Sequence, residues 1–134
     1  MKRLCLLLGL IGAPSMAGNV EVLHWWTSSS EVKALQLVKQ SLTEQGHQWH
    51  DFAVTGGGGD SAMTVLRTRA VSGNPPASAQ IKGPEIQEWA SLRFLLPLDE
   101  LAKQQNWGAL YSPTVLDYLR YQDNYVAVPF NIHR

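Results

Sequence analysis

The sequence predicts an α/β fold in which a mostly parallel sheet is flanked by helices. Short apolar, strand-like stretches alternate with amphipathic, helix-like stretches from residue 20 to residue 90. The order is strand, helix, strand, helix, strand, helix, and this alternation favours parallel strands joined by right-handed helical crossovers. Residues typical of turns and helix caps separate the stretches, which strengthens the assignment.

The first strand is expected from Val20 to Trp26. Residues 28–31 read SSSE, which has the S-x-x-E form of a capping box, so a helix should begin there. This helix should run to Gly46, because apolar residues recur at helical spacing before it. Those residues are Val32, Leu35, Val38 and Leu42. Trp49 to Val54 is the second expected strand.

The second helix is expected to follow the four glycines at 56–59, with Asp60 as its N-cap. Its apolar side holds Met63, Leu66 and Ala70, and the segment Gly-Asn-Pro-Pro at 73–76 should end it. A third strand is expected from Ala77 to Lys82. Pro84 then suits the first position of a third helix.

The rest of the chain predicts short elements. We expect one helix from Leu98 to Gln105, another from Pro113 to Leu119, and a turn at 122–124 followed by a strand within Tyr121 to Pro129. The length suits one domain. The chain reaches Arg134 within an apolar stretch that has no polar tail, so we expect this domain to be incomplete.

Residues 1–17 have the pattern of a secretory signal peptide. Lys2 and Arg3 precede an apolar stretch at 4–12, and small residues lead to an expected cleavage after Ala17. The apolar stretch is far shorter than the ~20 residues that a spanning helix needs, so no membrane insertion is expected. Cys5 lies inside it and offers neither a disulfide nor a lipid attachment site. The mature protein is therefore expected in the periplasm.

Charge excludes two classes of partner. Lys2 and Arg3 are two of the 11 basic residues, so the mature chain would carry 9 basic and 11 acidic residues, a formal net charge of −2. The sequence shows no run of Lys or Arg. Neither nucleic acid nor an anionic membrane is expected as a partner.

Two pairs of residues lie at the carboxyl ends of the first and third expected strands, the edge where open parallel sheets bind ligands. Trp25 and Trp26 end the first strand, and Gln80 and Lys82 end the third. Consecutive strand side chains point to opposite faces, so at most one indole can be fully in the core. With the nearby serines and Glu31, they make the mixture that suits a sugar, which has an apolar C–H face and a belt of hydroxyls.

Each of these residues also has a plainer interpretation. The indoles could simply pack in the core, and Glu31 could serve only the capping box. Lys82 could be a solvated strand end. The sequence alone leaves both interpretations open.

The sequence gives weaker support for a dinucleotide, metal or catalytic site. Gly57-x-Gly59 precedes a helix as in a dinucleotide fingerprint, but it follows the second strand and no acidic residue lies about twenty positions on. The glycines better suit a close backbone approach to a ligand or to the other half of a cleft. His47, His50 and Asp51 lack a further ligand for a metal site, and no catalytic arrangement is apparent. We therefore expect no cofactor and no metal.

Four stretches together resemble the amino-terminal part of the periplasmic glucose/mannose-type sugar-binding proteins of ABC importers, within family 1 of the extracellular solute-binding proteins. The resemblance covers essentially the whole mature chain. The stretches are VEVLHWWTSSSE at 20–31, residues 51–76 around the glycines, AQIKGPEIQEWA at 79–90 and YVAVPFNIHR at 125–134.

This resemblance implies a periplasmic-binding-protein-like (type II) amino-terminal lobe over residues 18–134, with the second lobe absent. It implies a monomeric, non-enzymatic protein that holds a monosaccharide such as glucose or mannose between two lobes and delivers it to an ABC permease. Residue by residue, it assigns sugar contacts to Trp25, Trp26, Glu31, Gln80 and Lys82, and it places Asn131 and His133 near the crossover to the second lobe.

Two other functions stay open. A secreted α/β carbohydrate-active enzyme domain would need a catalytic residue that the sequence does not show. A structural or chaperone-like periplasmic module would expose its tryptophans without a ligand. A saturable fluorescence change with sugar and without product distinguishes the binding protein from both.

Overall fold

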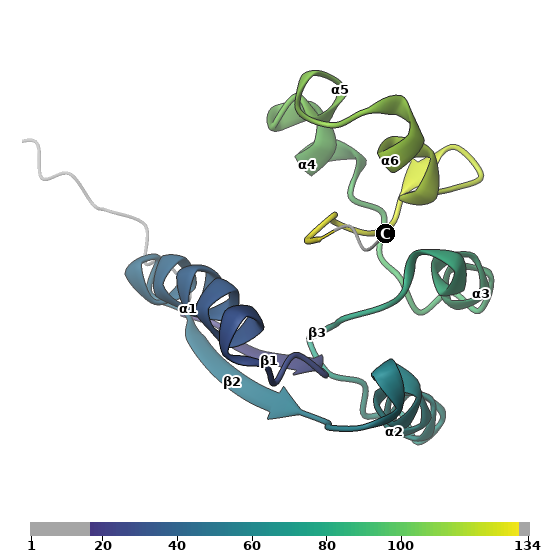
Figure 1. Ribbon diagram of the computed structural model, residues 1–134. Helices are drawn as coiled ribbons and strands as arrows, with labels where there is room; N and C mark the ends of the chain where they lie inside the picture. The colour runs from purple at the N-terminus through teal and green to yellow at the C-terminus, as the bar shows by residue number, and fades with distance from the viewer. Residues whose placement is uncertain (1–16, 132–134) are drawn as a thin grey trace, which may run out of the picture.

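The computed structural model describes residues 17–131 and has the predicted α/β architecture (Figure 1). Three parallel strands, β1 (Asn19–His24), β2 (Gln48–Ala53) and β3 (Ser78–Ala79), form a sheet in the order β2-β1-β3. β1 pairs with β2 along its full length, from Asn19 opposite Gln48 to His24 opposite Ala53. β3 pairs with β1 over two residues only. The α/β class and the parallel sheet flanked by helices are thus confirmed, as expected of a periplasmic-binding-protein-like lobe.

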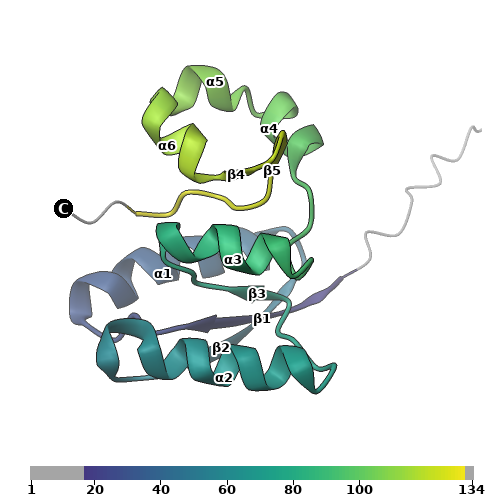
Figure 2. The ribbon, with the colours of Figure 1, turned by 90° about the vertical axis from the view of Figure 1, so that its right-hand side faces the viewer.

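Helices cover both faces of this sheet (Figure 2). α1 (Ser29–Glu44) lies on one face, and α2 (Asp60–Val71) and α3 (Ile86–Ser91) lie on the other. Single 3₁₀ turns at Gly57–Gly59 and Gly83–Glu85 lead into α2 and α3. The helices therefore form two layers around the central sheet.

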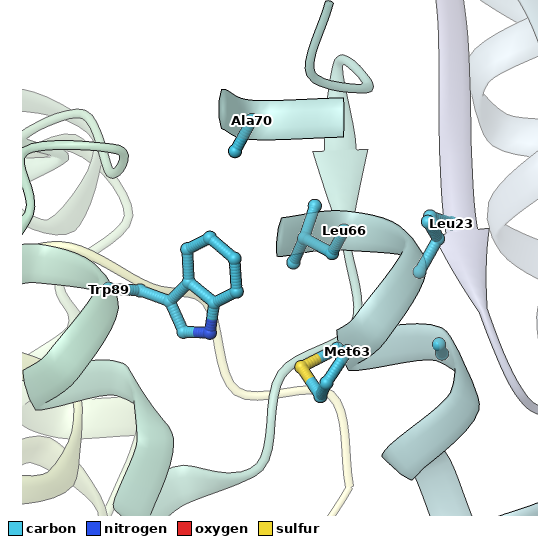
Figure 3. Close-up of a cluster of buried hydrophobic side chains, with 6 residues drawn as sticks. Leu23, Met63, Leu66, Ala70 and Trp89 are labelled. Carbon is cyan, nitrogen blue, oxygen red and sulfur yellow. The ribbon is translucent and has the colours of Figure 1, made fainter. Parts of the chain in front are cut away.

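The main core lies between the sheet, α2 and α3. Leu23 is fully buried at its centre, and Trp89 of α3 closes it at 2% exposure. Figure 3 shows the α2 side chains between β1 and this indole. The other buried members are Ala62, Met63, Leu66 and Ala70. Three of the members from α2 are those that the sequence pattern assigned to its apolar side.

A second, smaller core lies on the other side of α3. Its elements are α4 (Asp99–Gln104), α5 (Trp107–Leu110), α6 (Pro113–Tyr118), and the antiparallel pair β4 (Arg120–Tyr121) and β5 (Asn124–Tyr125). Its buried residues are Ile86, Ala102, Trp107 and Leu119. Because α3 supplies Trp89 to the first core and Ile86 to the second, this short helix joins the two.

The capping box at the start of α1 is confirmed. Ser28 Oγ accepts a hydrogen bond from the Glu31 backbone N–H at 3.4 Å, and the Glu31 carboxylate accepts one from the Ser28 backbone N–H at 3.0 Å. Each side chain satisfies a backbone N–H that has no partner within the helix.

Several predicted element ends were wrong. β1 ends at His24, so both tryptophans lie just beyond it. Gly59 rather than Asp60 is the N-cap of α2. The third strand is only Ser78–Ala79, because it pairs with β1 alone over two residues. The strand expected to reach Pro129 is limited to Asn124–Tyr125, and residues 126–131 are irregular.

The predicted signal peptide and its Cys5 fall almost wholly outside the described residues, as does His133. Within residues 17–131, no helix combines the length and apolar character that crossing a membrane requires.

Candidate functional site

The two tryptophans after β1 turn to opposite sides of the sheet. Trp25 is half-buried and packs at the edge of the main core, beside α2. Trp26 is only 5% exposed and lies on the side of α1, where its ring centroid is 4.5 Å from that of Phe130. The expectation that at most one indole is fully buried is confirmed. Of the two, Trp25 presents more surface to a ligand.

Gln80, which directly follows β3, contacts the backbone of Trp25. The backbone N–H of Trp25 donates to Gln80 Oε1 at 3.1 Å, and the backbone N–H of Gln80 donates to the carbonyl of Leu23 at 2.8 Å. The structure therefore brings together two of the predicted site residues that are 55 positions apart.

Gly59 lies directly against the Trp25 indole. A Cβ at this position would lie 2.9 Å from Trp25 Cε2, closer than real Cβ contacts come. The residue has a φ of +105°, in the range that favours glycine. The glycine tract was expected to approach a ligand or the other half of a cleft. In the described residues Gly59 approaches an aromatic ring of the same chain.

Lys82 lies at this edge of the sheet and pairs with Asp60, a residue that the sequence analysis treated only as a cap. Lys82 Nζ is 3.2 Å from Asp60 Oδ1, and the two side chains are 40% and 78% exposed. An ion pair this exposed adds little stability. Both groups stay accessible, and together they offer a donor and an acceptor of hydrogen bonds next to Gly59.

Glu31 is at the same edge, because α1 begins only a short loop after β1 ends. Its carboxylate accepts hydrogen bonds from the backbone N–H and the hydroxyl of Ser28, the latter at 2.6 Å. The capping role is therefore present. A sugar contact by Glu31 remains a prediction.

A polar network that the sequence analysis missed lies on the α1 side of the sheet. His24 is 2% exposed, and its Nε2 lies 2.6 Å from Asp51 Oδ1 on β2. The indole N–H of Trp49 donates to the same oxygen at 3.3 Å. The hydrogen bond from His24 is the main cause that holds the pKa of the Asp51 carboxyl below its ordinary value. A cavity of about 230 Å³ lies beside this network, under α1.

Asp51 was considered with His47 and His50 as a weak metal set, but its partner is His24 on the neighbouring strand. His47 instead accepts a hydrogen bond from the backbone N–H of Gly18 through Nδ1, at 3.1 Å. Within residues 17–131, no group of three or more His, Cys, Asp or Glu side chains is placed to hold a metal ion.

Comparisons with known proteins relate this chain to sugar-binding proteins. No protein-family model matches it. It is 43% identical over 115 residues to a "Probable sugar-binding periplasmic protein" of Brucella suis, a match that covers 86% of this chain and 27% of that protein. A protein of the same name from Rhizobium meliloti is 42% identical over 121 residues, covering 90% of this chain and 29% of that protein.

A more distant relative is an uncharacterised ABC transporter extracellular-binding protein of Pyrococcus horikoshii, 27% identical over 119 residues. The chain thus spans less than a third of the length of these curated relatives. The two bacterial relatives are named as periplasmic proteins, which confirms the periplasmic location expected from the sequence.

Proposed function

We propose that this chain forms one wall of the sugar site in the substrate-binding component of an ABC importer. In this proposal residues 18–134 are the amino-terminal lobe, a second lobe supplies the opposite wall, and the loaded protein delivers its sugar to a membrane permease. The observation that carries the proposal is a half-buried indole, Trp25, fixed at the carboxyl edge of a parallel sheet beside exposed polar groups. The names of the relatives support the class of ligand and the transport role.

The chemistry of this edge suits a pyranose. The Trp25 ring offers an apolar face for the C–H side of a sugar. Gln80 uses its amide oxygen on the Trp25 backbone, so its amide N–H groups remain for hydroxyls. Lys82 adds donors and Asp60 adds carboxylate acceptors, so neighbouring hydroxyls meet both kinds of partner.

We assign the remaining predicted residues as follows. Glu31, at the start of α1, accepts a hydrogen bond from a sugar hydroxyl. Its carboxylate is already oriented by hydrogen bonds from Ser28. Trp26, which is more deeply buried, supports this wall from the side of α1. We propose a monosaccharide of the glucose or mannose type as the ligand, on the resemblance of the four sequence stretches.

The wall by itself should bind weakly. Covering one face of an indole removes ~50 Å² from water, worth about 1.3 kcal/mol at ~25 cal/mol/Å². A few hydrogen bonds add about 0.5–1.5 kcal/mol each. Because a millimolar complex corresponds to about 4 kcal/mol and a micromolar one to about 8 kcal/mol, we expect millimolar or weaker affinity for the 134-residue chain.

The test is a titration of the chain with glucose and with mannose, followed by the tryptophan indole N–H resonances, with glycerol as a non-sugar control. A saturable shift of the Trp25 resonance with sugar, and no new product, is the expected result. Trp25→Ala should weaken binding about tenfold, the equivalent of about 1.4 kcal/mol, while Trp25→Phe keeps an aromatic face and most of the affinity.

Lysine variants check the polar part of the site. Lys82→Ala should weaken sugar binding, whereas Lys33→Ala, at an exposed position on α1, should not. Equal affinity of Trp25→Ala and the unaltered chain would refute the proposed site. Release of a cleaved product from a glycoside would instead favour the alternative, a secreted α/β carbohydrate-active enzyme.

A further inference from the structure

We propose that His24 is a positioning residue of this sugar site: its imidazole links Asp51 on β2 to the backbone of Trp26 and so fixes the peptide between the two tryptophans. The inference rests on the proposed function for its consequence in binding. Its structural part rests on the contacts of the structure alone.

The backbone pairing of the sheet ends where the tryptophans begin. The last backbone contacts there are the donation from Val54 N–H to the His24 carbonyl at 2.7 Å and the donation from Gln80 N–H to the Leu23 carbonyl at 2.8 Å. Beyond this point the next two N–H groups of the chain, those of Trp25 and Trp26, bond to side chains instead.

These two side chains act on Trp25 from both ends. The side chain of Gln80 accepts a hydrogen bond from the backbone N–H of Trp25 itself, at 3.1 Å. His24 Nδ1 accepts one from the backbone N–H of Trp26, the next residue, at 3.2 Å. Because the two peptide planes that flank Trp25 are both held, the backbone dihedrals of this residue are restricted. The direction of its Cα–Cβ bond is therefore set before a ligand arrives, and the contact of the ring with Gly59 further restricts the indole. Such restriction lowers the ordering cost of binding.

The two contacts of His24 define one tautomer. Nδ1 must be an acceptor toward Trp26, so the ring proton lies on Nε2 and is donated to Asp51 Oδ1, 2.6 Å away. The indole of Trp49 donates to the same carboxylate oxygen and helps to hold it. The side chains that line the adjacent cavity from α1 include Gln36 and Lys39. A buried histidine is thus oriented by a neighbouring strand rather than by its own.

A matched pair of variants separates positioning from mere packing. The side-chain oxygen of asparagine reaches the place of Nδ1, so His24→Asn keeps an acceptor for the Trp26 N–H but loses Asp51. Glutamine reaches the place of Nε2, so His24→Gln keeps a donor for Asp51 and leaves the Trp26 N–H without its acceptor. Both variants lose the same ring, so each is the other's control for packing.

The expected results concern the free chain first. The imidazole ¹⁵N shifts of the unaltered chain should report the Nε2–H tautomer, and the Trp26 amide should exchange with solvent faster in His24→Gln than in His24→Asn. Glucose titrations should then show a fivefold or greater loss of affinity in His24→Gln and less than a twofold loss in His24→Asn. The tautomer measurement needs no variant, so it stands even where a variant does not fold.

Three outcomes would count against these ideas, and they differ. An Nδ1–H tautomer, or equal exchange of the Trp26 amide in both variants, overturns the backbone link itself. Sugar binding that is lost equally in both variants overturns positioning and leaves packing. If the tautomer and the exchange pattern are as expected but the Trp25 resonance responds to no sugar, the proposed function is overturned. The link between His24 and Trp26 then still stands.

Discussion

Replacing Gly59 by alanine would add a methyl group where the indole of Trp25 already lies. The new Cβ would be 2.9 Å from Trp25 Cε2 and 3.0 Å from Cδ2 and Cζ2. The residue would also have to keep a φ of +105°, which an L side chain rarely adopts. The backbone conformation costs about 1–2 kcal/mol, and the crowding costs about 1–3 kcal/mol more. We expect Gly59→Ala to destabilise the fold by about 2–5 kcal/mol in total.

Gly58→Ala is the matched control. Gly58 also has a positive φ, +56°, but a Cβ there would meet no atom within 4 Å, so this variant carries the backbone cost alone. Urea unfolding followed by circular dichroism measures both free energies of unfolding. Tryptophan emission reports whether the ring has moved. The reasoning fails if the two variants unfold at the same urea concentration with the emission of the unaltered chain.

Three further changes test the core, a helix cap and an ion pair. Leu23→Ala removes a fully buried side chain and should cost about 2–5 kcal/mol, whereas Leu37→Ala, at a position 71% exposed, should stay within about 0.5 kcal/mol in the same urea assay. Ser28→Ala removes the cap of α1 and should cost about 1 kcal/mol; an unchanged unfolding midpoint would show that the cap is not needed. The hydrogen bond from Arg69 is the main cause that lowers the pKa of Glu21 in the folded chain. The resulting stability is present above the unfolded pKa of ~4.3 and is lost as the pH falls through the lower, folded pKa. Thermal melts of Glu21→Gln should therefore show a smaller drop in melting temperature over this acidic range, and an identical drop would argue against the pair.

The order of the first six elements follows from local patterns, and it was predicted correctly. The capping box at Ser28 and Glu31 and the apolar spacing of α2 involve residues within a turn or two of each other. Such signals depend only on residues that are near each other in the sequence. The extent of β3 could not be predicted in this way, because a strand exists only where a neighbour pairs with it, and here β1 pairs with two residues.

The sequence by itself determined the α/β class, and it predicted that at most one of the two indoles would be fully buried. That prediction came from the alternation of strand side chains, although both tryptophans lie just beyond β1. Only the tertiary structure decided which indole is buried. Trp26 packs against Phe130, which lies 104 positions later in the chain, whereas Trp25 packs against Gly59. Contacts over such separations depend on how the elements pack, and no local pattern records them.

The same distinction explains His24. Its sequence neighbours mark it only as a polar residue near the end of an apolar strand. Its partner Asp51 lies 27 positions away. The two become neighbours because the register of β1 and β2 pairs Asp51 with Val22, whose side chain is on the same face of β1 as that of His24. Gln80 reaches the Trp25 backbone from just beyond β3, 55 positions away. The candidate site residues were thus proposed from the predicted strand ends, whereas the hydrogen bonds that orient them exist only once three strands lie side by side.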